Sequence, residues 1–291
     1  MELNYIEAFL AVQKTQSFSN AATLLYLSQP AITRRIQLLE QELGTPLFER
    51  LRGGVRSTPA GNAFLPHAQR ATAALQDGAS AVLDLQQKVQ GSVSLAVVGT
   101  LASTDLTTKL QVFRQAHPDV DLRLRTARSS EVSAAVRQGD VALGLRYFSG
   151  SDDGLVAKKV WDEEQVLVCS TIRDTEASSE PTELISKLPW ATYPVGSSGE
   201  PFTRVLDRLL LQAGLETVER LTIDSLTAQK RLIEAGFAVG LLPVSSIQEE
   251  LQLGTLRILD LPEFEASVPV FALYRRDGYL SKGAQTLLNL F

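Results

Sequence analysis

The sequence predicts a chain of three parts: a small helical N-terminal domain with a β-hairpin wing, one long linker helix, and an α/β domain of two lobes. Three observations predict this fold class. Three short segments before Gly44 repeat apolar residues at helical spacing, and a Gly-Gly turn follows them. A longer apolar repeat begins at Thr58, and from Gly91 onward apolar strands alternate with helical stretches, which is typical of a parallel sheet. We therefore expect domains at residues 1–58, 59–90 and 91–291.

The composition is that of an ordinary folded protein. The 291 residues are 44% hydrophobic and 21% charged. A single cysteine, Cys169, excludes an intramolecular disulfide and a cysteine-rich metal site, and favours a reducing, cytosolic compartment. No apolar run approaches the roughly 18 residues that span a bilayer, and residues 1–9 lack a basic leader. We therefore expect neither membrane insertion nor secretion by a signal peptide.

Charge is distributed unevenly along the chain. The net charge of -5 argues against a protein that coats nucleic acid indiscriminately. Residues 1–58, however, hold six basic and five acidic groups, and five of those basic groups fall between Arg34 and Arg56. A nucleic-acid surface is therefore expected in that segment.

Each N-terminal helix has its own start and stop signals. The spacing predicts a first helix over residues 3–14 and a second over 18–25, with Ser17 as its N-cap. Ser28 can cap a third helix with Pro30 in its first turn, where the missing N–H costs nothing, and Gly44 ends it. Apolar and polar residues of this helix occupy opposite faces: Ile32, Ile36, Leu39 and Leu43 against Pro30, Thr33, Arg34 and Gln37.

Three short helices with a tight turn before the third describe a helix-turn-helix, whose third helix enters the major groove of DNA. Arg34 can donate two hydrogen bonds to guanine, Gln29 can pair with adenine or a phosphate, and Thr33 can meet a base edge, a thymine methyl or a phosphate. Arg35 is expected at a phosphate or a carboxylate. The Gly53-Gly54 turn predicts a wing whose basic side chains grip the sugar–phosphate backbone. This DNA surface comprises Ser28, Gln29, Pro30, Thr33, Arg34, Arg35, Gln37, Arg52 and Arg56. The alternative is an amphipathic helix with a solvated basic face.

Four runs carry a resemblance to a known family: FSNAA at 18–22, LSQPAITRRI at 27–36, LEQELG at 39–44 and PLFER at 46–50. The segment through Gly61 closely resembles the N-terminal domain of LysR-type transcriptional regulators. The resemblance implies a winged helix-turn-helix, a dimerising linker helix, and an effector-binding domain with the fold of type 2 periplasmic binding proteins. It also implies that Arg34 reads bases and that Arg50 and Thr58 contact the DNA backbone. Thr33 stands where the family commonly has serine, and both carry a small hydroxyl.

The linker can be read from its own pattern. Thr58 and the proline that follows it form an N-cap and first turn, and apolar residues then recur every three or four positions: Phe64, Ala68, Ala71, Leu75, Ala79, Val82 and Leu85. About 30 residues at about 1.5 Å each give a helix of about 45 Å, which one small domain cannot cover. A second copy of the chain is the natural partner, in a homodimer or homotetramer. Pro66 removes one helical hydrogen bond, and His67 is expected at the interface. RNA polymerase is a further candidate partner of such a regulator.

The remaining residues predict two α/β lobes. Strands are expected at 93–98, 120–126 and 141–145 in the first lobe and at 166–169, 190–193, 221–223 and 239–242 in the second. The family resemblance implies that a strand at 268–274 returns to the first lobe. Lobe I would then comprise 91–161 and 267–291, and lobe II 162–266.

Loops at the carboxyl ends of these strands predict a ligand cleft between the lobes. Hydroxyl groups, close-approaching glycines and two arginines in these loops favour an anionic small-molecule effector, because arginine and helix N-termini bind carboxylate or phosphate. The expected residues are Thr100, Leu101, Ser103, Arg128, Ser129, Arg146, Gly196, Ser197, Ser198, Phe202 and Asp224. Alternatively, each hydroxyl merely caps a helix, and the arginines face solvent or pair with Glu200 or Asp224.

The chain offers little material for catalysis or metal binding. His67 and His117 are its two histidines, and neither accompanies a serine in a Gly-x-Ser-x-Gly turn. Cys169 is expected to be a buried structural thiol. A transport-type solute-binding protein would share the two lobes, but it would need a secretory signal and would not carry the DNA-reading segment. We therefore predict a regulator of transcription with no catalytic residue, metal or permanent cofactor.

Overall fold

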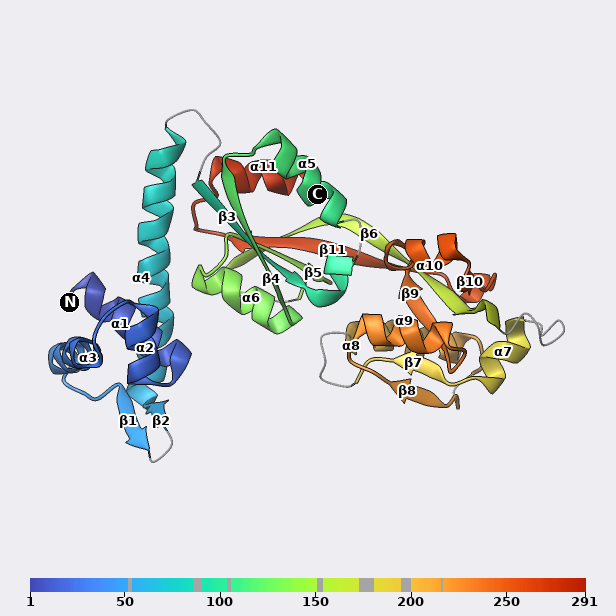
Figure 1. Ribbon diagram of the computed structural model, residues 1–291, viewed down its shortest axis with the longest axis horizontal. Helices are drawn as coiled ribbons and strands as arrows, with labels where there is room; N and C mark the ends of the chain where they lie inside the picture. Colours follow the sequence, from blue (N-terminus) through green and yellow to red (C-terminus); the bar gives the residue numbers. More distant parts are fainter. Residues whose placement is uncertain are drawn as a thin grey trace. The chain divides into compact units, whose positions relative to one another are not determined.

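A computed structural model describes residues 1–51, 54–85, 91–103, 106–150, 154–172, 181–194, 200–215 and 217–291. The chain divides into two compact units (Figure 1). Unit 1 holds Met1–Lys88 with two short segments, Gln138–Asp140 and Asp277–Ser281, and unit 2 holds the remaining residues. Within the described ranges, none of the helices has the length and apolar character needed to cross a bilayer.

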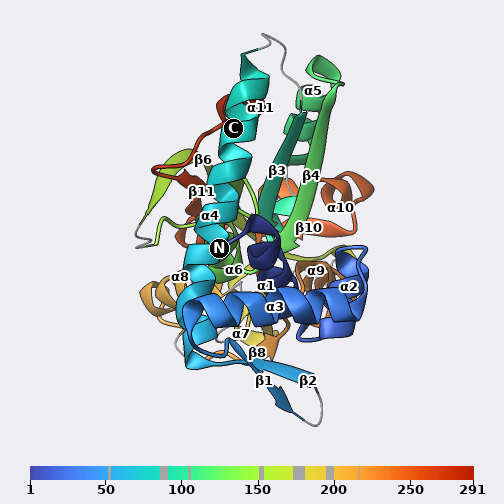
Figure 2. The same ribbon diagram turned by 90° about the vertical axis from the view of Figure 1, so that its left-hand side faces the viewer.

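Unit 1 is a helical bundle with a two-stranded wing (Figure 2). Its elements are α1 (Leu3–Thr15), α2 (Phe18–Leu24), α3 (Gln29–Leu43), β1 (Phe48–Leu51), β2 (Gly54–Ser57) and α4 (Pro59–Asp84). Phe9, on α1, is fully buried at the centre of their shared core. Its ring lies 5.3 Å from that of Phe48 on β1 and 5.1 Å from that of Phe64 on α4. Aromatic packing therefore fixes both the wing and the start of the long helix to the bundle.

The capping signals in the sequence act locally as predicted. The side chains of Ser17, Ser28 and Thr58 each accept a hydrogen bond from the backbone N–H three residues further on, at the starts of α2, α3 and α4. Gly44 ends α3 with a φ of 69°, a left-handed conformation that glycine adopts without steric cost. The long helix continues through Pro66 to residue 84.

Unit 2 is built on one mixed sheet, with nine strands in its described part. The order is β4-β3-β5-β11-β6-β9-β7-β8, and β10 also pairs with β6. Strands β3, β4 and β5 are parallel to one another, as are β7, β8 and β9, whereas β6 and β11 run antiparallel to their neighbours. The strands are β3 (Gly91–Val98), β4 (Val120–Ala127), β5 (Leu143–Tyr147), β6 (Leu155–Ser170), β7 (Trp190–Thr192), β8 (Arg220–Thr222), β9 (Val239–Pro243), β10 (Leu256–Ile258) and β11 (Ala266–Arg275).

The sheet forms two lobes that share the strand β6. Its first part, from Leu155 to Gln165, pairs with β11, and residues Gln165 to Val168 pair with β9. The chain therefore passes from lobe I to lobe II near Glu163 and Gln165, which we call the hinge. Figure 1 shows α5 (Leu106–Ala116) and α11 (Lys282–Leu290) on one side of the lobe I strands and α6 (Ser129–Gln138) on the other.

The sequence prediction was too short for the hinge strand. Only residues 166–169 were expected, whereas β6 is 16 residues long. Its first part carries Lys158, Lys159, Asp162 and Glu164, so the apolar alternation that signals a strand is missing there. Four other elements were also not anticipated: α7 (Pro181–Lys187), α10 (Gln248–Leu253), β10 and α11. Helices α8 (Glu200–Gln212) and α9 (Leu226–Glu234) lie close to residues 202–213 and 225–235, where the sequence predicts helices.

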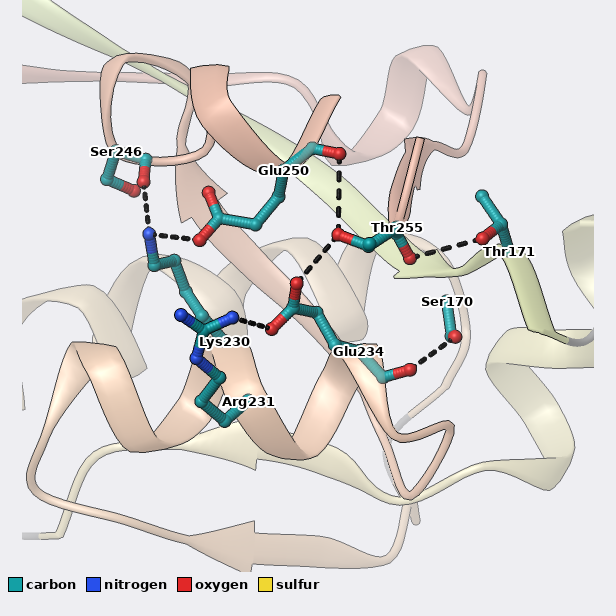
Figure 3. Close-up of polar contacts among 8 residues, drawn as sticks. All are labelled: Ser170, Thr171, Lys230, Arg231, Glu234, Ser246, Glu250 and Thr255. Atoms are coloured by element: carbon teal, nitrogen blue, oxygen red, sulfur yellow. Dashed lines mark hydrogen bonds and ion pairs between the residues drawn. The ribbon is translucent and has the colours of Figure 1, made fainter. Parts of the chain in front are cut away.

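A polar network, of which Glu250 and Ser246 are buried, holds α9 against the segment that follows β9 in lobe II (Figure 3). The Lys230 ammonium lies 2.6 Å from Glu250 Oε1 and donates a 2.7 Å hydrogen bond to the Ser246 carbonyl. Glu234, at the end of α9, accepts hydrogen bonds from Arg231 at 2.7 Å and from Thr255 at 2.6 Å. Burial alone would raise the pKa of Glu234, but these two hydrogen bonds hold it below its usual value.

Candidate functional site

The first turn of α3 presents polar side chains to solvent. Ser28, Gln29, Pro30, Arg34 and Gln37 are exposed, and Thr33 and Arg35 are half-buried. Ile32, Ile36 and Leu39, on the opposite face, are buried in the core of unit 1. Burial of one face therefore fixes which residues of the helix remain available to a ligand. All the α3 residues predicted to meet DNA retain some exposure.

Two of the predicted base-reading residues already contact each other. The Gln29 side-chain amide donates a 2.9 Å hydrogen bond to the Thr33 hydroxyl, one turn further along α3. This contact orders the Gln29 side chain along the surface of the helix. No other side-chain hydrogen bond of Gln29 occurs within the described residues, so its amide oxygen is free to accept a bond from adenine N6.

The side chains of Glu40 and Thr58 anchor the wing to the helices by hydrogen bonds to backbone groups. Glu40 of α3 accepts bonds from the backbone N–H groups of Leu47 at 2.7 Å and Phe48 at 3.2 Å. The Thr58 hydroxyl donates to the Pro46 carbonyl at 2.8 Å while it caps α4. Gly61 permits the close approach of α4 to this turn, because a Cβ there would lie 2.3 Å from the Leu47 carbonyl oxygen. The wing is therefore held at a fixed position on α3.

The predicted wing contacts are only partly described. Arg56 is exposed and forms a 2.6 Å ion pair with Glu49 on the neighbouring strand. Thr58 is half-buried, with its hydroxyl proton given to Pro46. Arg52 and the side chain of Arg50 lie outside the described residues.

Beyond the bundle, the apolar stripe of α4 is left exposed by the described residues. Phe64 and Ala68 pack on the core of unit 1. Further along, Leu75 is 55% exposed, Val82 63% and Leu85 80%. A helix with an uncovered row of large apolar side chains exposes the kind of surface that protein partners bury.

The predicted ligand residues of unit 2 differ in how accessible they are to a ligand. Thr100, in the 3-10 turn η1 (Gly99–Ser103), and Phe202, in the first turn of α8, are buried, whereas Arg128 and Asp224 are exposed and Ser129 is half-buried. Leu101 is fully buried and its side chain serves the lobe I core. Gly196, Ser197, Ser198 and the side chain of Ser103 lie outside the described residues.

Arg146 and Tyr147 are neighbours on β5 that point to opposite faces of the sheet. The Arg146 guanidinium donates to the Ser133 hydroxyl of α6 at 2.6 Å and to the Phe148 carbonyl at 3.1 Å. Gly144 lies on the same face, where a Cβ would clash with Val132 of α6. Arg146 is therefore engaged with α6 rather than with the side of the sheet that Tyr147 faces.

Tyr147 joins the lobes through aromatic contacts and was missed as a site residue. Its ring lies 4.4 Å from the Phe202 ring of lobe II in an edge-on arrangement, and Phe202 lies 6.0 Å from Tyr193 at the end of β7. Burial raises the pKa of Tyr147, and the negative charge of Glu163 raises it further. Burial likewise raises the pKa of Tyr193. Both phenols are therefore neutral hydrogen-bonding groups at physiological pH.

Glu163 supplies a buried carboxylate at the hinge. It is 6% exposed and accepts hydrogen bonds from the Trp161 indole at 3.2 Å and from the Ser245 hydroxyl. Ser245 follows the carboxyl end of β9, in the 3-10 turn η3 (Val244–Ser246). Among the described residues, Glu163 forms no ion pair. Its position on a charged, weakly patterned strand gave no sequence signal that it would be buried.

Three buried polar atoms of unit 2 lack a hydrogen-bond partner in the described part of the chain, and the strand register places two of their residues, Tyr147 and Gln165, on the same sheet face as Glu163. They are the Thr100 hydroxyl, the Tyr147 hydroxyl and the Gln165 side-chain carbonyl. The three residues are 8%, 2% and 1% exposed. Buried polar groups are normally hydrogen-bonded, so such a cluster indicates a place where another molecule supplies partners.

A cavity of about 380 Å³ lies beside the hinge strands. It is lined by Glu164, Gln165, Val166, Glu265, Ala266 and Ser267. Across β6 and β11, Gln165 pairs with Ala266 and Glu164 with Ser267, so the cavity lies at the segment where the chain passes between the lobes. In the ranges that the structure describes, no group of histidine, cysteine and acidic side chains could hold a metal ion.

A helix-turn-helix with a wing, followed by a two-lobed α/β domain with buried polar groups at its hinge, defines a DNA-binding regulator that responds to a small molecule. Comparison with known families agrees. Residues 3–62 match the model of the bacterial regulatory helix-turn-helix protein, lysR family, and residues 86–291 match the LysR substrate binding domain. The chain belongs to the LysR family of transcriptional regulators.

Individual relatives match along almost the whole chain. A probable RuBisCO transcriptional regulator of Gracilaria tenuistipitata var. liui is 28% identical, over 99% of this chain and 96% of the relative. The HTH-type transcriptional regulator TfdS of Cupriavidus pinatubonensis is also 28% identical, over 95% and 93%. The crystal structure of full-length CbnR with its target DNA has a TM-score of 0.70 at 23% identity, over 99% and 98% of the two chains. The protein is thus a regulator of transcription with a DNA-binding and an effector-binding domain, and not an enzyme.

Proposed function

We propose that the protein binds its operator as a homodimer or homotetramer and that an anionic small molecule in unit 2 changes this binding. Residues 1–58 contact DNA, residues 59–90 pair with a second copy, and residues 91–291 hold the effector. In this assignment lobe I comprises 91–161 and 267–291 and lobe II 162–266. The protein acts in the cytoplasm, where bacterial DNA lies, and controls the access or activity of RNA polymerase.

The observation that carries the DNA assignment is the exposed first turn of α3. Ser28 caps this turn, the core residues behind it fix its rotation, and Glu40 fixes the wing beside it. Arg34 and Gln37 are exposed on the face opposite the core. A rigid helix N-terminus with arginine and amide side chains matches the donor and acceptor pattern of base edges in the major groove.

The observation that supports self-association is the uncovered stripe of α4. Leu75, Val82 and Leu85 recur at helical spacing with more than half of each side chain exposed. Because the same stripe exists on a second copy, two such helices can bury it against each other. Pairing of this kind would place two helix-turn-helix domains on two half-sites of one operator.

The anionic character of the effector rests on Arg128 and the start of α6. Arg128 is exposed immediately before the first residue of α6, and Ser129 adds a hydroxyl there. One feature opposes an anion at this helix: Glu131 already accepts a 2.9 Å hydrogen bond from the Arg128 backbone N–H. We therefore assign the anion to the Arg128 guanidinium rather than to the helix amides.

The DNA assignment is tested with Arg34→Ala and Arg50→Ala on an operator selected from a random-sequence library. Arg34→Ala should weaken specific binding by about 1–3 kcal/mol and flatten the preference at one base pair. Arg50→Ala should weaken specific and non-specific binding alike and reduce the salt dependence by about one unit of slope. Arg123→Ala, an equal charge change on β4, is the matched control and should leave both affinities unchanged. An Arg34→Ala protein with an unchanged specificity ratio would refute the base-reading role.

The effector assignment is tested by calorimetry with Arg128→Gln and the ligand found in a thermal-shift screen. Loss of a charge-assisted contact should weaken binding by about 1.5–3 kcal/mol and leave effector-free DNA affinity intact. Arg125→Gln, on the exposed edge strand β4, carries the same charge change and serves as control. Equal affinity in both variants would show that Arg128 does not hold the ligand.

A further inference from the structure

The hinge of unit 2 is acidic and rich in acceptors at its buried centre. Glu163 is 6% exposed, and its two described partners, Trp161 and Ser245, are neutral donors. A carboxylate taken out of water costs several kcal/mol unless charge or hydrogen bonds compensate it. Two neutral hydrogen bonds leave one further lone pair on each carboxylate oxygen. The carboxylate therefore retains capacity for a donor that the chain itself does not supply in its described part.

The neighbouring unpartnered atoms can also accept hydrogen bonds from a ligand. The Gln165 side-chain carbonyl is an acceptor only, and the hydroxyls of Thr100 and Tyr147 can accept as well as donate. Gln165 lies two residues from Glu163 on β6 and donates its amide to the Glu163 carbonyl at 3.3 Å. On β11, Val270 pairs with Tyr147 and Val268 pairs with Glu163, so the Tyr147 and Glu163 side chains project to the same face of the sheet from β5 and β6.

We propose that this site takes a ligand with a protonated amine, held by the Glu163 carboxylate together with the Gln165 carbonyl and the hydroxyls of Thr100 and Tyr147. An ammonium group has three donors, a positive charge and no acceptor, which matches a carboxylate with neutral acceptors beside it. The rings of Tyr147, Phe202 and Tyr193 contact one another and would supply the apolar surface next to the Tyr147 hydroxyl. This part of the inference rests on the proposed function, in which an anionic group of the effector binds at Arg128. An effector with that anionic group and a protonated amine at Glu163 is a zwitterion of the amino-acid class.

The test uses the full chain and three matched sets of compounds, with thermal shift first and calorimetry on the hits. The sets are the common L-amino acids, the same compounds without the amine, and the same compounds without the carboxylate. We expect at least one amino acid to raise the melting temperature while its des-amino counterpart does not. The expected loss of affinity for that amino acid in Glu163→Gln is about 10- to 100-fold.

Two further variants separate a ligand contact from a folding defect. Glu249→Gln makes the same change on an exposed side chain of α10, away from the hinge, and should alter affinity by no more than about two-fold. Tyr147→Phe removes a buried hydroxyl without a described partner, so the free protein should be at least as stable. Its affinity for the amino acid should fall by about 2- to 10-fold.

The outcomes distinguish this inference from the anionic effector. Binding of des-amino acids as tight as that of amino acids would overturn the inference and leave the anionic effector standing. Unchanged affinity in Glu163→Gln would overturn it as well. Binding of amines without a carboxylate, at full affinity, would support the inference and overturn the anionic assignment. If no compound of any set binds, the inference is wrong, and the anionic effector is then decided by the thermal-shift screen and the Arg128→Gln calorimetry.

Discussion

The buried ion pair of lobe II allows one stability prediction to be worked through in detail. In Lys230→Met, the ammonium that contacts Glu250 Oε1 at 2.6 Å and the Ser246 carbonyl at 2.7 Å is replaced by a thioether of similar length. The apolar stem can still pack beside α10. Figure 3 shows this ammonium between Glu250 and Ser246; without it, the Glu250 carboxylate has lost its cation.

The magnitude follows from the burial of the two partners. The Lys230 side chain is 15% exposed and that of Glu250 is 4% exposed, and Glu250 Oε2 has no hydrogen-bond partner within the described residues. Removing one partner of such a pair costs about 3–5 kcal/mol, because an uncompensated charge remains in the interior. That is a large part of the about 5–15 kcal/mol that stabilise a typical domain. The double variant Lys230→Met with Glu250→Met removes both charges and should recover most of the loss.

Urea unfolding followed by tryptophan fluorescence measures this effect, since Trp190 is fully buried in the same lobe. Lys159→Met is the matched control. Its ion pair with Asp162 has side chains 52% and 45% exposed, and solvent screening limits its contribution to about 0–1 kcal/mol. A Lys230→Met protein that loses no more stability than Lys159→Met would refute the reasoning, because the carboxylate would then have found water or another partner.

Two further predictions concern unit 1. Leu75→Asp places a carboxylate in the uncovered stripe of α4 and should dissociate the oligomer in sedimentation experiments while the helix-turn-helix remains folded. The control Gln76→Asp, off the stripe, should leave the oligomer intact. An intact oligomer in Leu75→Asp would place Leu75 outside the interface. Glu40→Ala removes the acceptor of two backbone N–H groups at the start of the wing and should lower the stability of unit 1 by about 1–3 kcal/mol in thermal unfolding. The control Glu42→Ala, at an exposed side chain, should change the stability by less than about 1 kcal/mol. Equal losses in the two variants would show that the wing does not depend on Glu40.

Unit 1 could be predicted almost entirely from the sequence because its signals are local. Ser28, Pro30 and Gly44 mark the ends of α3 by conformational preferences that act within one turn, and the structure uses each of them in that way. The position of Glu40 was not predicted. Its role depends on where the chain returns after α3, which a helical repeat does not encode.

The effector-site residues stay a prediction, and the sequence named only some of the buried side chains near the hinge. Thr100 and Phe202 lie where strand ends and helix starts were expected to meet. Tyr147, Glu163 and Gln165 were missed, because their burial results from the approach of two lobes and not from a local pattern. Glu163 in particular lies on a strand with charged neighbours, where an exposed side chain is the ordinary expectation.

The residues proposed to contact the ligand come from lobe I, from lobe II and from the strand that joins them, and this explains how a ligand at this site would regulate the protein. Tyr147 belongs to lobe I, Phe202 and Tyr193 belong to lobe II, and Glu163 lies on the strand that joins them. A ligand that touched only one lobe would bind equally well to every arrangement of the two and would shift none of them, however tightly it bound. A ligand that needs the hinge carboxylate and both lobes at once gains its full binding energy in one arrangement only. The difference in binding energy between arrangements, rather than the affinity itself, is what can change operator binding.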